Sequence, residues 1–168
     1  SSFHNCFGCG PHHDIGLRVR TFSGEDGGVL CPIVIPRRFE GPVGMAHGGI
    51  VAAYLDEVLG GAAVNHTGRL YITGELTVRY VKSAPLERPL LGRGRALLDS
   101  GKYLDLEATI EDWETREIVA KATGRHGVAP HRTREAPSAP PEGAVRFRCQ
   151  GSGVRSGVCS GIVNSNSI

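Results

Sequence analysis

The sequence has no apolar run long enough to span a membrane. Its longest apolar stretch, residues 48–64, is interrupted by Asp56 and Glu57, whereas a transmembrane helix needs about 20 consecutive apolar residues. No basic segment precedes an apolar one, so no signal peptide is recognisable. With 40% hydrophobic and 21% charged residues among 168, the composition excludes a membrane protein and a wholly disordered chain, and the length suits one globular domain.

A disulfide framework is also missing. The five cysteines are Cys6, Cys9, Cys31, Cys149 and Cys159. This odd number with no regular spacing favours free thiols in a reducing compartment, by default the cytoplasm or an organelle lumen kept reducing. Cys6 and Cys9 precede His12 and His13 and could be assembled into a zinc site, but no second close pair of Cys or His follows in the body. We therefore expect no metal and no cofactor, with the two cysteines packed in an N-terminal turn.

The first 129 residues have no excess of basic side chains. Five of the 19 lysines and arginines and two of the 17 acidic residues lie in residues 130–168, which leaves the rest of the chain with a net charge of −1. This part of the chain gives no sign of a nucleic-acid partner. From Ala129 the sequence is rich in Pro, Ser, Gly and Arg, with few apolar residues to offset the entropy of ordering. We predict a domain at residues 1–128 and a flexible tail at 129–168.

Motifs for several other chemistries are absent. No Ser or Cys lies in a Gly-x-Ser-x-Gly elbow, and neither a phosphate loop nor a dinucleotide-binding fingerprint occurs. Serine or cysteine hydrolases of that type and nucleotide-binding enzymes are therefore not favoured.

The body alternates apolar and polar stretches separated by turn residues. One convincing helix is predicted from His47 or Gly48 to about Val64. Strands are predicted at Leu17–Phe22, Val29–Ile35, Tyr71–Val81, Leu90–Leu98, Lys102–Glu111 and Ile118–Val128. Between Leu104 and Ile110, apolar and polar residues alternate, so one face of this strand is buried. One apolar helix against one antiparallel sheet is an α+β arrangement.

The predicted helix carries a carboxylate on a face of small residues. At offsets of three, four and seven, Asp56 shares this face with Gly49, Ala52, Ala53, Gly60 and Ala63. A helix that is apolar nearly all round is expected to be buried, so a carboxylate in its middle is paired, protonated or functional. The simpler alternative is a structural ion pair of Asp56 or Glu57 with an arginine.

Two glycines, Gly48 and Gly49, open this helix. A helix N-terminus presents unpaired N–H groups and the positive end of the dipole, which suits a developing oxyanion. Glycine at this position lets a thioester approach without a Cβ in the way. The alternative is a plain loop-to-helix turn. Together with Asp56 about two turns further along, the motif His47-Gly48-Gly49 predicts an acyl-transfer site.

Three stretches carry a family resemblance: CFGCGPHHDIGL (6–17), GPVGMAHGGIVAAYLDEVLGGAA (41–63) and ITGELTVRYVKSAPL (72–86). With the outer strands they cover about residues 3–128 in consistent order, and the middle stretch is the specific one. The chain resembles the hotdog-fold thioesterases, in particular the PaaI-like acyl-CoA branch.

The resemblance implies a long helix wrapped by an antiparallel sheet of about five to six strands. It also implies subunits that pair edge to edge into a homodimer or homotetramer, with the active site at the dimer interface. Asp56 matches the family's catalytic general base or nucleophile, and Gly49 the main oxyanion donor. His47 would shape the loop and bind the thioester region. Thr73, from the partner subunit's strand, would orient water or the carboxylate.

Substrate-binding residues are expected around this centre. Gly48 and Glu57 flank it in the sequence. The resemblance implies that basic residues near the strand ends meet the CoA phosphates, and Arg79, Lys82 and Lys102 fit that description, although charge on an exposed strand also serves plain solvation.

The predicted function is hydrolysis of an acyl-CoA to free acid and CoA without a metal or cofactor. One alternative is a hotdog-fold hydratase or dehydratase, which needs a catalytic histidine opposite the carboxylate. His47 and His66 are the only body histidines expected near the helix. The other alternative is a non-catalytic acyl-thioester binder or oligomeric scaffold.

Overall fold

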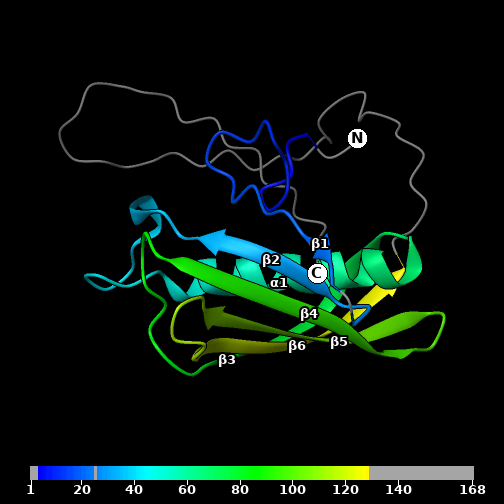
Figure 1. Cartoon of the computed structure of the whole chain (residues 1–168). Coiled ribbons are helices and arrows are strands. Elements are labelled where there is room, and N and C mark those ends of the chain that lie inside the picture. The colour runs from blue at the N-terminus through cyan, green and yellow to red at the C-terminus, as the bar shows by residue number, and fades with distance from the viewer. Residues whose placement is uncertain (1–3, 25, 129–168) are drawn as a thin grey trace, which may run out of the picture. The chain divides into compact units, whose positions relative to one another are not determined.

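A computed structural model of the chain describes residues 4–24 and 26–128 (Figure 1). The strands are β1 (Phe22–Ser23), β2 (Val29–Val34), β3 (Tyr71–Tyr80), β4 (Pro89–Asp99), β5 (Tyr103–Asp112) and β6 (Ile118–Val128). A 3-10 turn at Arg37–Phe39 precedes the long helix α1, Gly48–Thr67. In this described part, no helix is long and apolar enough to cross a membrane. The predicted tail at 129–168 lies outside the described residues.

The strands form one antiparallel sheet in the order β1-β2-β4-β5-β6-β3. Helix α1 packs against β2 to β6 and is seen behind β2 and β4 in Figure 1. The long strand β3 pairs with β6 only, so it forms one edge of the sheet. The predicted α+β hotdog architecture is confirmed, with six strands in the described residues.

Local chemistry defines both ends of α1. The His47 side chain caps the first turn, and Gly68, with φ of 69°, ends the helix in a left-handed conformation and donates its N–H to the Val64 carbonyl. The helix therefore extends three residues beyond the predicted end. Its buried face has helical spacing and consists of Val51, Tyr54, Leu55, Val58, Leu59, Ala62 and Ala63.

The inner face of the sheet completes the core. The alternation predicted on β5 is confirmed, because Leu104, Leu106 and Ile110 are fully buried. Glycines on β4 allow the helix to approach: a Cβ at Gly94 would lie 2.8 Å from a methyl carbon of Val58. Each fully buried leucine or isoleucine contributes about 1.5–3 kcal/mol to folding.

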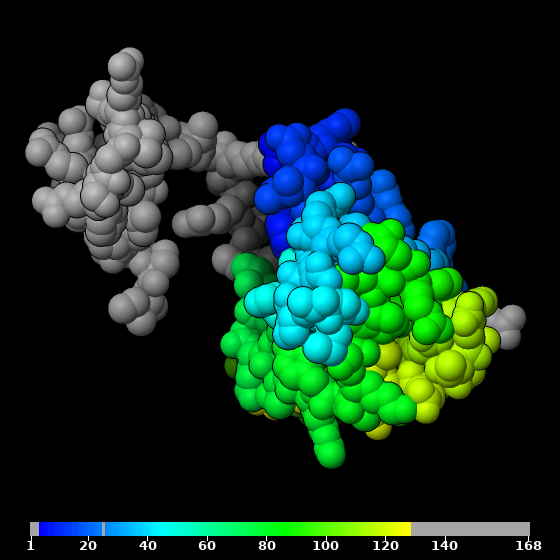
Figure 2. All heavy atoms as spheres, turned by 90° about the vertical axis from the view of Figure 1, so that its left-hand side faces the viewer, coloured from blue at the N-terminus to red at the C-terminus, as the bar shows by residue number. Residues whose placement is uncertain are grey.

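The first predicted strand, Leu17–Phe22, is wrong except at its last residue. The N–H groups of Leu17 and Val19 donate to the carbonyls of Phe7 and Gly8 at 2.8 Å, so this segment bonds to the N-terminal loop instead of the sheet. Arg18, with φ of 55°, interrupts the extended backbone. The alternation of apolar residues is real, but it serves packing of the N-terminal segment, blue in Figure 2, onto the body.

Candidate active site

Asp56 and Thr73 meet on the side of α1 that faces the edge strand. The Thr73 hydroxyl donates a hydrogen bond of 2.7 Å to Oδ1 of Asp56. The Asp56 side chain is 36% exposed, so its carboxylate is reachable from solvent. A β-bulge interrupts the pairing of β3 with β6 between Thr73 and Glu75. The bond forms within one chain, whereas the resemblance implied a Thr73 from the partner subunit's strand.

His126 is the third side chain at this position, and the sequence reasoning missed it. It is paired with Thr73 in the register of β6 and β3, and its Nε2 lies 4.0 Å from Oδ1 of Asp56. The side chain is 1% exposed, and neither ring nitrogen has a hydrogen-bond partner among the described residues. Burial lowers the pKa of His126, and the nearby Asp56 charge opposes that shift. The imidazole is therefore held neutral beside the carboxylate.

A usable signal for His126 existed in the sequence. Ala120, Ala122, Gly124 and His126 follow at every second position of β6, and all four are buried. Period-two spacing therefore directs this histidine to the inner face of the sheet. By contrast, His66 lies near the C-terminal end of α1, where it faces Asp99 at 3.6 Å.

The helix N-terminus has one amide already in use. The Gly49 N–H donates to Nδ1 of His47 at 3.0 Å, so the predicted oxyanion donor is occupied by its own N-cap in this structure. The Gly48 N–H makes no hydrogen bond among the described residues. Tyr80 donates its hydroxyl proton to the Gly48 carbonyl at 2.9 Å. The amide open to a ligand is thus Gly48, which the sequence reasoning assigned to substrate binding.

A hollow of about 430 Å³ lies beside this helix N-terminus. Its lining includes Gly48, Tyr80 and Lys82, and the Lys82 ammonium also pairs with Glu117 at 2.5 Å. Asp56 is eight residues further along α1, a rise of about 12 Å at 1.5 Å per residue. The helix N-terminus and the carboxylate of one chain therefore cannot contact the same carbonyl group.

The remaining predicted binding residues lie apart from this centre. Glu57 turns towards the N-terminal loop, where it contacts Gly8 and lies near the Cys9 thiol. Burial, followed by the charge of Asp56, raises the pKa of Glu57. Lys102 is exposed in the turn before β5, where its carbonyl accepts from the N–H of Val128.

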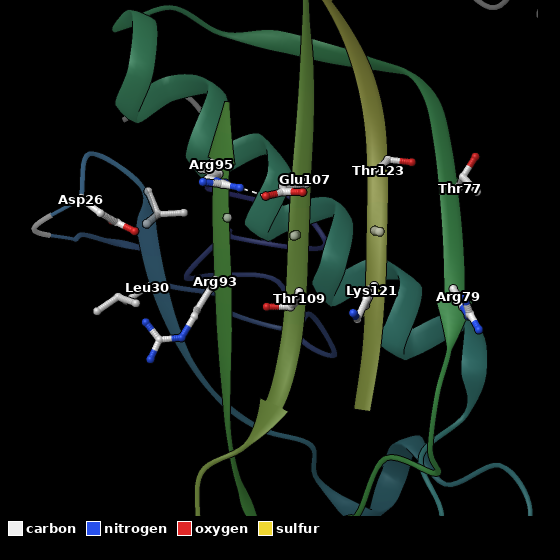
Figure 3. A pocket seen from close by; sticks show the side chains of 14 residues that line it. Asp26, Leu30, Thr77, Arg79, Arg93, Arg95, Glu107, Thr109, Lys121 and Thr123 are labelled. Carbon is white, nitrogen blue, oxygen red and sulfur yellow. Dashed lines mark hydrogen bonds and ion pairs between the residues drawn. The ribbon is translucent and has the colours of Figure 1, made fainter. Parts of the chain in front are cut away.

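Arg79 lies on the outer face of the sheet. It lines a second hollow, of about 580 Å³, together with Arg93, Arg95 and Lys121, and α1 runs behind the sheet from this side (Figure 3). Arg95 pairs with Glu107 here, and Arg93 pairs with the neighbouring Glu111. This larger hollow is separated from Asp56 by the sheet, so the two are distinct.

Comparisons with known proteins agree with this architecture. The thioesterase superfamily model matches residues 43–119. Among curated proteins, no sequence matches the chain. A solved thioesterase superfamily protein is 28% identical with a TM-score of 0.62, and the alignment covers 69% of this chain but 59% of that one.

Two further solved structures are similar. A Streptococcus mutans UA159 protein bound to acetyl CoA is 27% identical, with a TM-score of 0.60 over 66% of this chain and 88% of that one. A phenylacetic acid degradation-related protein from Ralstonia eutropha JMP134, described as a putative thioesterase, is 23% identical, with a TM-score of 0.58 over 67% of this chain and 86% of that one. One helix packed on a six-stranded antiparallel sheet is the hotdog fold, and within it residues 43–119 match the thioesterase superfamily model.

Proposed function

We propose that the protein is an acyl-CoA thioesterase that hydrolyses an acyl-CoA to a free acid and CoA. The observation that carries this proposal is the Asp56 carboxylate, half-exposed and oriented by the hydroxyl of Thr73. The similar Streptococcus mutans protein bound to acetyl CoA supports a CoA thioester as the ligand. A carboxylate of this kind either activates water or attacks the thioester directly.

We further propose that the complete site forms between two subunits paired along β3. This ten-residue edge strand has unpaired backbone groups, which natural proteins usually cover. Thr73 contacts Asp56, and Tyr80 contacts Gly48. An antiparallel pairing of β3 with its copy, centred near Thr77, brings Thr73 close to the partner's Tyr80. Asp56 then faces the partner's Gly48, which removes the separation of about 12 Å within one chain.

In this arrangement each group has a defined role. As general base, Asp56 takes a proton from water while the water oxygen attacks the thioester carbon. The carbonyl oxygen becomes an oxyanion, which the partner's Gly48 N–H and helix dipole stabilise. Collapse of the intermediate breaks the C–S bond and releases the CoA thiolate, which takes up a proton. As nucleophile, Asp56 would instead form a mixed anhydride that water then cleaves.

His47 and Gly49 shape the first turn of α1 beside the proposed oxyanion site. In this structure the His47 ring holds the Gly49 amide, so this pair fixes the first turn of the helix. Rotation of the His47 side chain would free the Gly49 N–H as a second oxyanion donor. Lys82, beside the hollow at Gly48, is the basic residue best located to meet a CoA phosphate. Arg79 and Lys102 lie further away, on the outer face and in the turn before β5.

An enzyme of hydration or dehydration is the second candidate. His126, 4.0 Å from Asp56, supplies the histidine that such chemistry needs opposite the carboxylate. The two reactions have different products. Hydrolysis releases a free thiol, whereas hydration of an enoyl-CoA removes its conjugated double bond and the associated ultraviolet absorbance.

The test is an assay of a panel of acyl-CoAs with a thiol reagent, run on wild type, Asp56→Ala and Asp99→Ala. Asp99 is the control because its carboxylate lies on β4 beside His66, away from the site. We expect thiol release by wild type and the control, and a loss of about 10²–10⁴-fold in Asp56→Ala. Unchanged hydrolysis by Asp56→Ala would contradict the proposal. Loss of enoyl absorbance without thiol release would favour hydration.

A further inference from the structure

Three metal-binding side chains meet next to the candidate site. The thiols of Cys6 and Cys9 and a carboxylate oxygen of Glu57 all lie within 4.8 Å of one another, and all three residues are half-buried. The donors of a tetrahedral zinc site are separated by about 3.8 Å, so only a small contraction would be needed. Glu57 lies 48 residues after Cys9, which is why the spacing of Cys and His in the sequence did not reveal it.

The backbone of the N-terminal loop holds the two thiols on one side. The Gly10 N–H donates to the Cys6 carbonyl at 2.9 Å, which closes a Cys-x-x-Cys-Gly turn. A Cβ at Gly10 would lie 2.5 Å from the Cys6 backbone, so this tight turn admits only glycine. Paired cysteines at this spacing are a common half of structural zinc sites.

The backbone of the same loop lies in close contact with the Glu57 side chain. A Cβ at Gly8 would lie 1.8 Å from Oε1 of Glu57, so the loop backbone reaches the carboxylate without an intervening side chain. Further along the segment, Thr21 contacts Gly61 on the next turn of α1. The thiols and the carboxylate are therefore held together by packing on both sides of the cluster.

Three acidic groups converge in this cluster. Burial, hydrogen bonding with Cys6 and the charge of Glu57 raise the pKa of Cys9 to about 12. Burial and the neighbouring Asp56 raise the pKa of Glu57. A divalent cation held between two thiolates and a carboxylate would offset the repulsion between their negative charges.

We propose that Cys6, Cys9 and Glu57 bind one Zn²⁺ ion that fastens the N-terminal loop to α1. Two thiolates and one carboxylate form a borderline-soft set that suits zinc, and a water molecule would complete the tetrahedron. On binding, both thiols release their protons and Glu57 coordinates as the carboxylate, so two protons leave for each ion bound. The proposed ligand Glu57 directly follows Asp56 in the sequence. The sequence alone had predicted no metal site.

The test uses Co²⁺ and Zn²⁺ with the full chain carrying Cys149→Ser and Cys159→Ser, kept reduced and freed of metal by a chelator. These two substitutions remove the tail thiols. We expect one equivalent of Co²⁺ to bind with a thiolate-to-cobalt charge-transfer absorption, and Zn²⁺ to displace it. Zn²⁺ should raise Tm by about 3 °C or more, because it binds the folded state. Failure of this protein to bind one equivalent of either ion would overturn the proposal, whatever the variants do.

Variants identify the ligands. We expect Cys6→Ser and Cys9→Ser to lose the charge-transfer absorption, and Glu57→Gln to weaken binding at least about tenfold. The matched control is Cys31→Ala, because the Cys31 thiol is buried in β2 and is not part of the cluster. It should bind Co²⁺ like the parent protein. Circular dichroism checks that each variant is folded. An unchanged absorption in folded Cys6→Ser or Cys9→Ser would show that the ion binds elsewhere and would refute the site.

Discussion

The hydroxyl of Thr73 donates to Oδ1 of Asp56 at 2.7 Å, and this bond links the edge strand β3 to the middle of α1. It fixes the carboxylate by one oxygen and leaves the other free to accept a proton. Because the bond joins two elements of one chain, the proposed base and its orienting hydroxyl lie in one subunit, and in the proposed dimer the partner supplies only the oxyanion donor. The predictions for Thr73 and Gly48 follow from that division.

Replacing Thr73 by valine should reduce kcat/KM by about 10–100-fold. Valine has nearly the same shape but cannot donate, and a hydrogen bond to a charged group contributes about 1.5–3 kcal/mol. Thr73→Ser keeps the hydroxyl and is the matched control, which should retain most of the activity. Steady-state kinetics on one acyl-CoA measure the difference. Equal rates for the valine and serine variants would remove the orienting role of this hydroxyl.

Sequence patterns were sufficient to predict where the helix and most strands lie, but not which segments they bond to. The helix and four of the long strands follow from periodicity, because the inner face of each strand and the buried face of α1 have characteristic spacing. The segment at 17–21 shows the limit of the method: its alternation is present, but its backbone bonds go to Phe7 and Gly8. Periodicity reports burial and does not identify the hydrogen-bond partner.

The candidate site also has residues that the sequence predicts and contacts that it does not. Asp56 and the glycine pair could be found because they lie on one helix at known offsets. The contact with His126 depends on β6 lying next to β3, and strand order is not encoded in the local sequence. The choice of Gly48 over Gly49 as the open amide depends on the rotamer of His47, which only the folded structure reveals.

His126 should make the protein less stable as the pH falls below about 6.5. Its pKa is lowered in the folded state because the ring is buried, so the unfolded chain binds more protons near and below the ordinary value of about 6.5. Its contribution to stability is therefore undiminished above that pH and is lost progressively as the pH falls towards the lowered pKa. Urea denaturation at pH 7.5 and 5.5 measures the effect.

The variant His126→Phe should lose this part of the pH dependence, because phenylalanine does not titrate. His66→Asn is the control, since His66 is exposed and lies in the last turn of α1, where it faces Asp99. It should keep the dependence. If His126→Phe and wild type lost the same free energy of unfolding between the two pH values, the buried neutral imidazole would not be its source.

Replacing Gly48 by proline should remove the oxyanion donor with little effect on folding. Gly48 is the first helical residue, a position at which proline is favoured, and His47 already has the extended conformation that a following proline requires. Loss of one oxyanion donor costs about 10²–10³-fold in kcat. Gly48→Ala keeps the N–H, and its Cβ would lie 3.6 Å from the Tyr80 ring, so this control should fold and keep clearly more activity than Gly48→Pro, even where the added Cβ hinders the thioester. Comparable rates for the two variants would argue against Gly48 as the donor.

Mixing two inactive variants should restore activity if the site is shared between subunits. In a mixed dimer of Asp56→Ala and Gly48→Pro, one of the two sites combines the intact Asp56 of one subunit with the partner's Gly48. The other site lacks both groups. Random exchange makes half of the dimers mixed, so about one quarter of wild-type activity should return, as expected for a two-fold symmetric pair with two equivalent sites.

The measurement is the acyl-CoA assay after unfolding and refolding the variants together. Each variant refolded alone is the control. Mixed samples no more active than the controls would mean that Asp56 and Gly48 act within one chain, which the separation of about 12 Å along α1 opposes.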